Sequence, residues 1–355
     1  MPRPKVAFVY PNSRLQLAAE VAAGTGADSF LLGQNHLAEL GYDAFVHEPR
    51  LRAVSEEGGL AHRVRWNLRE ALVPWELGDA DVVVSALPNL LPLSARVRRR
   101  PQVVVLDFAL ATLLDRRSGL ERRVLEASLR SAAAVVSLSE VQRRRLLERV
   151  ALDPRRAHTV LLGIDHEFLH PGERSRSEPF VLAVGKDLAR DYRTLAEAAA
   201  RVHVPFVVVT EPRNVRGIEL PPNVSVRRGL PYAELRDLYA GAACVVLPVR
   251  SPSYAYGTEG GGLTALLEAM AMAKPVVVSD RPVFHEYLRD GESGLVVPPE
   301  DPEALAAAVR VLLDEPDRAE RVGRAARETI EQRHTMRHFA AGLAAVLRSL
   351  PRRQP

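Results

Sequence analysis

Short valine-rich runs alternate with amphipathic segments along most of the chain. Runs in which apolar residues are not interrupted by polar ones are typical of parallel strands that are buried on both faces. Strands are expected over 6–10, 44–47, 81–85 and 102–106, and again over 180–185, 204–210, 224–227, 244–247 and 276–279. Because helical patterns separate these runs, the sequence predicts an α/β fold with parallel sheets.

The helical patterns fall between the predicted strands and at the end of the chain. Apolar periodicity predicts helices over 28–43, ended by Gly41, and over 194–202, 302–313 and 337–350. The segment 171–179 is rich in turn formers and charged residues, which indicates a linker. We therefore expect a first domain over 1–170, a second over 171–336 and a terminal helical segment over 337–355.

Length and composition agree with a soluble two-domain enzyme. The chain has 355 residues, and domains commonly contain about 100–200. No apolar run reaches the roughly 18 residues of a membrane span, and the N-terminus lacks the flanks of a signal peptide. The single cysteine, Cys244, lies in an apolar run and predicts a buried thiol. A cytoplasmic location is the expectation.

Arginine is unevenly distributed. The net charge of the whole chain is +4, but residues 96–156 contain 15 arginines against 7 acidic residues, a local excess of 15 − 7 = +8. One interpretation is a basic face that contacts an anionic or lipid-linked acceptor, or the surface of a membrane. The other is a set of solvated helices. Aromatic residues do not alternate with these arginines, so nucleic acid is not expected as a partner.

A glycine-rich loop leads into an apolar helix near residue 260. The pattern of the helix places Glu268, its only charged residue, roughly 130° from the centre of the apolar stripe, and the preceding turn offers free N–H groups to anions. This arrangement favours a site for phosphate and hydroxyl groups. A packed helix that carries one solvated glutamate is the simpler alternative.

The segment Gly262-Leu-Thr-Ala-Leu-Leu-Glu-Ala-Met-Ala-Met-Ala-Lys-Pro-Val-Val277 resembles the signature helix of retaining glycosyltransferases of the GT-B fold, family 4. The resemblance implies two Rossmann-like domains that face each other across a cleft, with the last helix returning to the first domain. Glu268 matches the glutamate that binds the ribose of a nucleotide-sugar. The family's first glutamate, eight positions earlier, is replaced by Gly260, and Glu259 stands one residue too early.

The resemblance also implies the other site residues. In family 4 the loop after the first strand of the second domain binds the donor diphosphate, and this role falls on Lys186 and, with a shift of one residue, on Arg190. Further positions implied for the donor are Gly261, Gly262, Leu263 and Thr264 at the helix start, Leu230 at the nucleobase, and Gly24 and Gly26 in a first-domain loop. Asp107 is expected on the acceptor side.

The expected reaction is transfer of a hexose from a nucleoside diphosphate sugar to an acceptor hydroxyl, with retention and without a metal or cofactor. Alternatives are a nucleotide-sugar hydrolase or epimerase, and a non-catalytic sugar-nucleotide binder. A metallopeptidase is a further alternative, because His166-Glu-Phe-Leu-His170 matches a zinc-binding pattern. Gly163 and Pro171 leave scarcely one helical turn there, so we interpret that match as coincidence.

Overall fold

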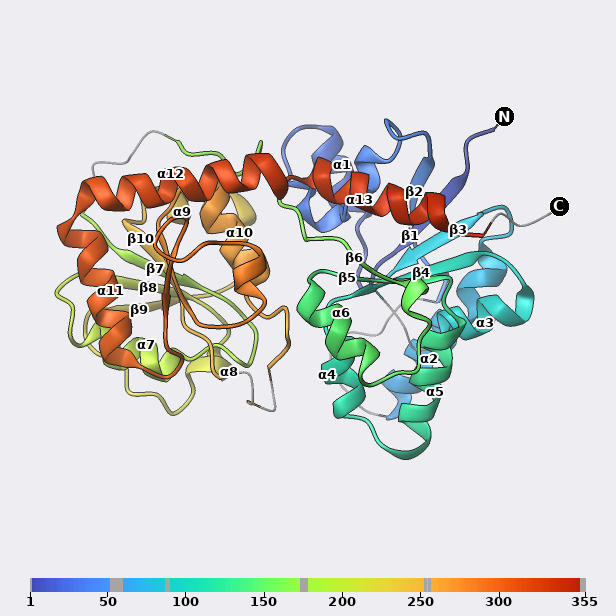
Figure 1. The fold of residues 1–355 in the computed structure, drawn as a ribbon, viewed down its shortest axis with the longest axis horizontal. Coiled ribbons are helices and arrows are strands. Elements are labelled where there is room, and N and C mark those ends of the chain that lie inside the picture. Colours follow the sequence, from blue (N-terminus) through green and yellow to red (C-terminus); the bar gives the residue numbers. More distant parts are fainter. Residues whose placement is uncertain are drawn as a thin grey trace. The chain divides into compact units, whose positions relative to one another are not determined.

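The chain forms two compact units, each described here separately (Figure 1). The computed structural model describes residues 2–51, 60–86, 90–172, 178–251, 254 and 257–351. The first unit contains Met1–Leu162 and Met336–Pro355, and the second contains Gly163–Thr335. The sequence predicted a boundary after residue 170, whereas the first unit ends at Leu162. Residues after Leu162 belong to the second unit because Ile164 pairs with Thr335 as an isolated β-bridge.

The first unit is built on a six-stranded parallel sheet in the order β2-β1-β3-β4-β5-β6. Its strands are β1 (Lys5–Val9), β2 (Asp43–His47), β3 (Val82–Ser85), β4 (Gln102–Asp107), β5 (Ala134–Ser137) and β6 (Ala157–Thr159). Most of their residues are buried, as the unbroken valine runs predicted.

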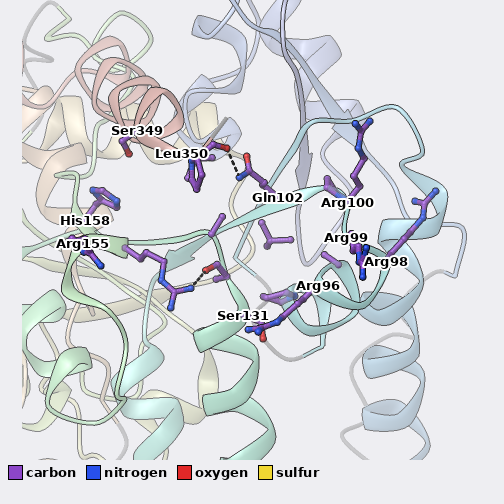
Figure 2. Close-up of a pocket in the computed structure, with 18 of the residues that line it drawn as sticks. Arg96, Arg98, Arg99, Arg100, Gln102, Ser131, Arg155, His158, Ser349 and Leu350 are labelled. Carbon is purple, nitrogen blue, oxygen red and sulfur yellow. Dashed lines mark hydrogen bonds between the residues drawn. The ribbon is translucent and has the colours of Figure 1, made fainter. Parts of the chain in front are cut away.

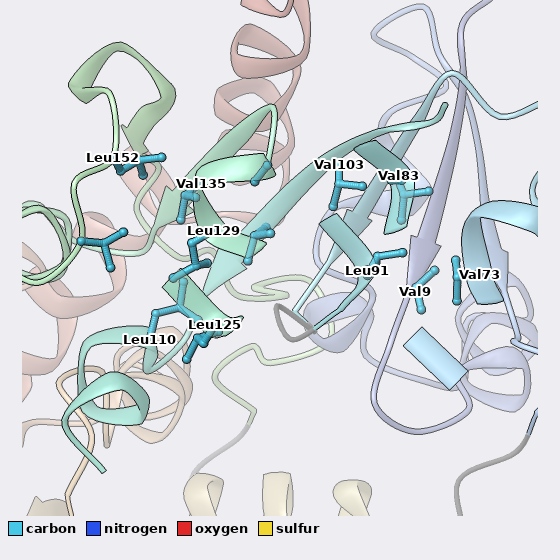
Figure 3. Close-up of a cluster of buried hydrophobic side chains, with 14 of the residues drawn as sticks. Val9, Val73, Val83, Leu91, Val103, Leu110, Leu125, Leu129, Val135 and Leu152 are labelled. Carbon is cyan, nitrogen blue, oxygen red and sulfur yellow. The ribbon is translucent and has the colours of Figure 1, made fainter. Parts of the chain in front are cut away.

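Helices cover this sheet. They are α1 (Leu15–Ala22), α2 (Leu60–Glu76), α3 (Leu91–Arg98), α4 (Leu110–Asp115), α5 (Gly119–Ser131), α6 (Glu140–Leu147) and α13 (Met336–Ser349), with 3-10 turns η1 (Asp28–Leu31), η2 (Gln34–His36) and η3 (Pro154–Arg156). A buried apolar cluster joins strand residues such as Val83, Val103 and Val135 to Leu125 and Leu129 of α5 (Figure 3). No helix in the described ranges is long and apolar enough to cross a bilayer.

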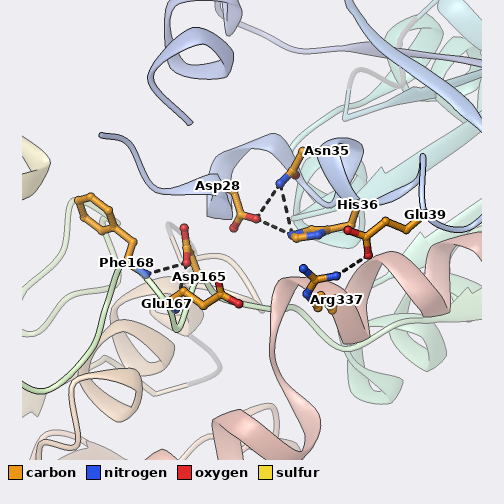
Figure 4. Close-up of polar contacts among 8 residues, drawn as sticks. All are labelled: Asp28, Asn35, His36, Glu39, Asp165, Glu167, Phe168 and Arg337. Carbon is orange, nitrogen blue, oxygen red and sulfur yellow. Dashed lines mark hydrogen bonds and ion pairs between the residues drawn. The ribbon is translucent and has the colours of Figure 1, made fainter. Parts of the chain in front are cut away.

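The predicted helix over 28–43 is wrong. The segment instead forms η1 and η2, and the α-helix of this connection is α1, which lies earlier. Leu32 and Gly33 take left-handed backbone angles, with φ of 51° and 77°, which end any continuous helix. Gly33 also lies under α13, because an added Cβ would stand 3.1 Å from the Cβ of Ala340. An ion pair between Arg337 and Glu39 holds the same helix to this segment (Figure 4).

The second unit has a six-stranded parallel sheet in the order β12-β11-β10-β7-β8-β9. The strands are β7 (Val181–Val184), β8 (Phe206–Val209), β9 (Val224–Arg227), β10 (Cys244–Leu247), β11 (Val276–Ser279) and β12 (Leu295–Val297). The chain order reverses between β7 and β10, the adjacent central pair. In doubly wound sheets, ligands bind outside the carboxyl ends of the strands at such a reversal.

The remaining elements of the second unit pack around this sheet. They are α7 (Tyr192–Ala199), α8 (Pro212–Val215), α9 (Tyr232–Gly241), α10 (Leu263–Ala271), α11 (Pro302–Asp314), α12 (Pro316–Arg333) and the 3-10 turn η4 (Phe284–Glu286). The predicted strands and helices of this unit match these elements closely, with boundaries that differ by one or two residues at most positions.

Helix α12 fixes the C-terminal end of α10. The guanidinium of Arg327 donates from Nη1 to the carbonyl of Ala271 at 2.6 Å, and also to those of His166 and Leu169. The bond to Ala271 satisfies a carbonyl group that the end of α10 leaves without a partner in the helix. Gly323 allows this close approach, because an added Cβ would lie 2.2 Å from the carbonyl oxygen of Ala273.

We expect Gly323→Ala to lower the free energy of unfolding of the protein by about 1–3 kcal/mol, because the methyl group must displace the backbone after α10. Urea denaturation followed by circular dichroism measures the change. Gly172→Ala is the matched control, since nothing lies within 4 Å of its added Cβ. Equal stability of the two variants would contradict this packing.

Candidate functional site

Two loops of the second unit converge where the strand order reverses. The loop after β7 carries Arg190, and the loop after β10 ends in the glycines before α10. The side chain of Arg190 lies against both, because a Cβ added to Gly185 would stand 2.0 Å from its Nε and one added to Gly262 would stand 3.4 Å from its Nη1. Glycine at position 185 is therefore what admits the guanidinium, and Gly262 borders it from the other loop.

Arg190 is a buried cation whose guanidinium has two nitrogens without a hydrogen-bond partner. Only 6% of the surface of Arg190 is exposed. Neither Nε nor Nη1 has a hydrogen-bond partner, and among the described residues no carboxylate forms an ion pair with it. Burying unpaired charge is costly, so the arrangement favours an anion that would occupy the space beside the guanidinium.

The start of α10 adds backbone donors beside this cation. Gly262 has φ of 104°, a conformation suited to glycine, and precedes the first helical residue. The amides of Thr264 and Ala265 have no acceptor within the described part of the chain. The amide of Leu263, predicted to bind phosphate, is instead used within the turn, where it donates to the carbonyl of Gly260 at 3.1 Å.

Glu268 is buried, and the prediction that it points away from the core is wrong. It is 3% exposed, and its two oxygens accept hydrogen bonds of 2.9 Å from the hydroxyls of Tyr232 and Tyr239. Helix α9 supplies both tyrosines and covers the face of α10 that the helical pattern assigned to solvent. The carboxylate still lies close enough to Arg190 for the arginine's charge to act on its pKa.

Lys186 follows β7 directly, in the same loop as Arg190. Its side chain is 65% exposed and forms an ion pair of 3.4 Å with Glu211. An exposed pair of this kind contributes little to stability and is easily exchanged for another partner. The loop after β7 thus carries an exposed positive charge on Lys186 and a buried one on Arg190.

Comparisons with known proteins identify the family of the chain. The family model described as Glycosyl transferases group 1 matches residues 213–329, which include α9 and α10. The chain is 30% identical over 268 residues to the alpha-maltose-1-phosphate synthase of Mycolicibacterium smegmatis, and the alignment covers 66% of each chain. The chain belongs to the glycosyl transferases group 1 family.

A second relative is the D-inositol 3-phosphate glycosyltransferase 1 of Catenulispora acidiphila, 29% identical over 54% of this chain and 51% of that protein. The chain thus matches about half to two thirds of the length of these relatives.

Solved structures establish the fold of this group 1 glycosyl transferase as GT-B. Sucrose-phosphate synthase of Thermosynechococcus elongatus superimposes with a TM-score of 0.75 at 19% identity, over 98% of this chain and 99% of that one. Anabaena HepE in complex with UDP and glucose gives 0.71 at 15% identity, over 98% and 100%.

Sequence reasoning missed three residues that shape the loops after β7 and β10: Asp187, Thr258 and Arg281. Asp187 joins the loops, since its Oδ1 accepts from the amide of Ala189 at 2.8 Å and its Oδ2 accepts from the hydroxyl of Thr258 at 3.2 Å. Arg281, 5% exposed, donates to the carbonyls of Thr258 and Gly261. No motif marks these positions, because their partners are distant in sequence.

The structure gives no further support for the expected binding roles of Leu230, Asp107, Gly24 and Gly26. Leu230 is half-buried in the loop before α9. Asp107 is 1% exposed and structural: its Oδ1 accepts from the amide of Leu110 at 2.7 Å and its Oδ2 from the hydroxyl of Ser137 at 2.8 Å. An acceptor-side role for this carboxylate is therefore not favoured. Gly24, with φ of 73°, and Gly26, packed against Glu20, lie in the loop after α1.

The zinc-like pattern 166–170 is not helical. Asp165 organises a turn there, accepting from the amides of Glu167 at 3.1 Å and Phe168 at 2.9 Å (Figure 4). The two histidines thus lack the shared helix face that a zinc peptidase needs. No group of three or more candidate metal ligands occurs in the described residues.

Burial raises the pKa of Glu268 to about 7, against hydrogen bonds from Tyr239 and Tyr232 and the charge of Arg190, which favour the ionised form. The folded protein therefore keeps this proton at pH values where the unfolded chain, with an ordinary pKa of 4.5, has released it. The resulting stabilisation is fully present at low pH and is lost as the pH rises towards the folded value.

We expect the free energy of unfolding of the wild type to fall, relative to Glu268→Gln, by up to about 1.4 kcal/mol per pH unit between pH 4.5 and 7. Glutamine keeps the size of the side chain but cannot titrate. Urea denaturation at several pH values provides the measurement, and Glu328→Gln, at an exposed helix position, serves as the control that follows the wild type. Parallel curves for the wild type and Glu268→Gln would contradict the raised pKa.

Proposed function

We propose that this protein transfers a hexose from a nucleoside diphosphate sugar to an acceptor hydroxyl, with retention of configuration. The observation that carries the proposal is the buried, unpartnered Arg190 beside Gly262 at the reversal of strand order. A diphosphate supplies the negative charge that this position lacks. Membership of a glycosyltransferase family supports the reaction class.

The reaction breaks the bond between the anomeric carbon and the diphosphate oxygen, and negative charge develops on the departing diphosphate. Arg190, Lys186 and the amides of Gly262 and Thr264 lower the barrier because fixed donors and cations stabilise that charge. The diphosphate itself takes the proton of the acceptor hydroxyl, which then bonds to the anomeric carbon. In this scheme neither a protein nucleophile nor a metal ion is needed.

Glu268 is assigned to the ribose of the donor. An ionised carboxylate offers about four acceptor positions, and the tyrosine hydroxyls occupy one on each oxygen. The half-buried Tyr232 marks the side from which a ribose hydroxyl would approach. The two tyrosines then hold the carboxylate in one orientation.

Replacing Arg190 by methionine tests the proposal. We expect Arg190→Met to lower kcat/KM by about a hundred-fold or more, the loss of a donor that stabilises transition-state charge. The melting temperature of the free protein should stay equal or rise, since an unpaired buried charge is removed. A thermal-shift panel of UDP, GDP, ADP and TDP sugars identifies the donor through ligand stabilisation, and coupled detection of released nucleoside diphosphate with product analysis measures transfer.

Arg193→Gln is the matched control, because Arg193 lies exposed on α7 near the same loop. It should leave donor binding unchanged. If the nucleotide-sugar raised the melting temperature of Arg190→Met as much as that of the wild type, Arg190 would not belong to the donor site. Free sugar released in the presence of every acceptor tested would indicate hydrolysis in place of transfer.

Activity is also expected to survive metal removal. After dialysis against EDTA, kcat/KM should change by less than about two-fold, since Arg190, Lys186 and the helix amides carry the charge stabilisation that a metal would otherwise supply. Initial rates with and without added Mg²⁺ or Mn²⁺ measure this. Loss of activity that either ion restores would contradict the metal-free scheme.

A further inference from the structure

The first unit contains a cavity of about 860 Å³ at the amino-terminal edge of its sheet (Figure 2). Its walls come from the end of α3, the beginning of β4, the end of α5, the turn η3 with β6, and the end of α13. A cavity of this size lies within the range of small-molecule sites, about 300–1,000 Å³.

The cavity is strongly basic. Its lining includes no acidic residue among those described, and the cationic side chains are Arg96, Arg98, Arg99, Arg100, Arg155 and Arg156, joined by His158. Figure 2 shows Arg155 and His158 on one side, and the arginines from the end of α3 on the other. Cations gathered in a concave surface concentrate positive potential, which attracts anions.

Few of these charges are neutralised within the protein. Arg155 pairs with Asp153 at 3.0 Å, and Arg156 donates from Nη1 to the carbonyls of Arg130 and Ala132. No ion pair is found for the other four arginines within the described residues. The Nη1 atom of Arg98 is buried and has no hydrogen-bond partner.

The cavity lies away from the edge where ligands of parallel sheets bind. Gln102 begins β4 at the cavity, whereas Asp107 ends the same strand at the carboxyl edge. At about 3.3 Å per residue, a strand of this length separates the two edges by roughly 15–20 Å. Several arginines of the excess over 96–156 therefore gather at the amino edge, away from any acceptor bound at the carboxyl edge.

We propose that this cavity binds a ligand that carries several phosphate groups, at a site separate from the donor loops. Guanidinium groups bind phosphate oxygens through paired hydrogen bonds, and several arginines around one concavity match several phosphates. A single phosphate ion would leave most of the volume empty. This site does not depend on the reaction proposed above.

Isothermal titration with sodium tripolyphosphate tests the site, with inorganic phosphate and sulfate as smaller anions. We expect saturable binding of tripolyphosphate that weakens with added salt. In Arg96→Gln/Arg99→Gln, at two exposed positions, affinity should fall at least ten-fold. Arg98→Gln removes the guanidinium whose Nη1 atom has no partner, and it should also lower the affinity for tripolyphosphate.

Arg123→Gln/Arg321→Gln is the matched control, because it removes the same charge from exposed positions outside the cavity. Its affinity should equal that of the wild type. The side-chain NMR signals of His158, assigned with His158→Gln, should shift on addition of tripolyphosphate in the wild type and in this control.

Sedimentation with phosphatidylcholine vesicles, with and without phosphatidylglycerol, distinguishes a lipid headgroup from a soluble phosphate compound. Binding to either source that is lost in Arg96→Gln/Arg99→Gln supports the proposal and names the source. Absence of binding to both, or equal binding by the cavity variant and the control, overturns it. The nucleotide-sugar should raise the melting temperature of the cavity variant and of the control by the same amount. A failure of the cavity proposal is therefore separable from a failure of the proposal for Arg190.

Discussion

A single buried guanidinium organises the donor loops of the second unit. Arg190 lies between two glycines from different loops and has neither a carboxylate nor a carbonyl on its Nε and Nη1 atoms. Folding alone gains nothing from such an arrangement, because the charge has lost water without finding a partner. This cost supports the anion site proposed above, and the first amides of α10, which lack acceptors, follow the glycine that borders the same guanidinium.

The rest of the second unit holds these loops in place. The reversal of strand order places the ends of β7 and β10 side by side. Asp187 ties one loop to the other, Arg281 supports the carbonyls of the glycine-rich turn, and Arg327 fixes the far end of α10. These contacts tie the helix to both loops, which is the preorganisation that the proposed stabilisation of a departing diphosphate requires.

Charge is used differently in the two units. In the second, an arginine without an ion pair and a carboxylate of raised pKa are buried near each other, and two tyrosine hydroxyls donate to the carboxylate. In the first, several exposed arginines share an open cavity at the amino edge of the sheet. The buried charges of the second unit suit a specific ligand held in a fixed position. The open cavity of the first unit suits a flexible polyanion.

The sequence by itself determined the two parallel-sheet units, most strand positions and the family, because valine runs, turn residues and the segment 262–277 are local signals. It also singled out Arg190, Lys186 and Glu268 as candidate donor-site residues, which stay predictions. Tertiary structure decided what surrounds them. Tyrosines of α9 cover Glu268, left-handed angles at Leu32 and Gly33 and the contact with α13 accompany short turns in place of the predicted helix over 28–43, and five elements bring scattered arginines together around a cavity. Periodicity reports which face of a helix is apolar; it carries no information about which partner covers the other face.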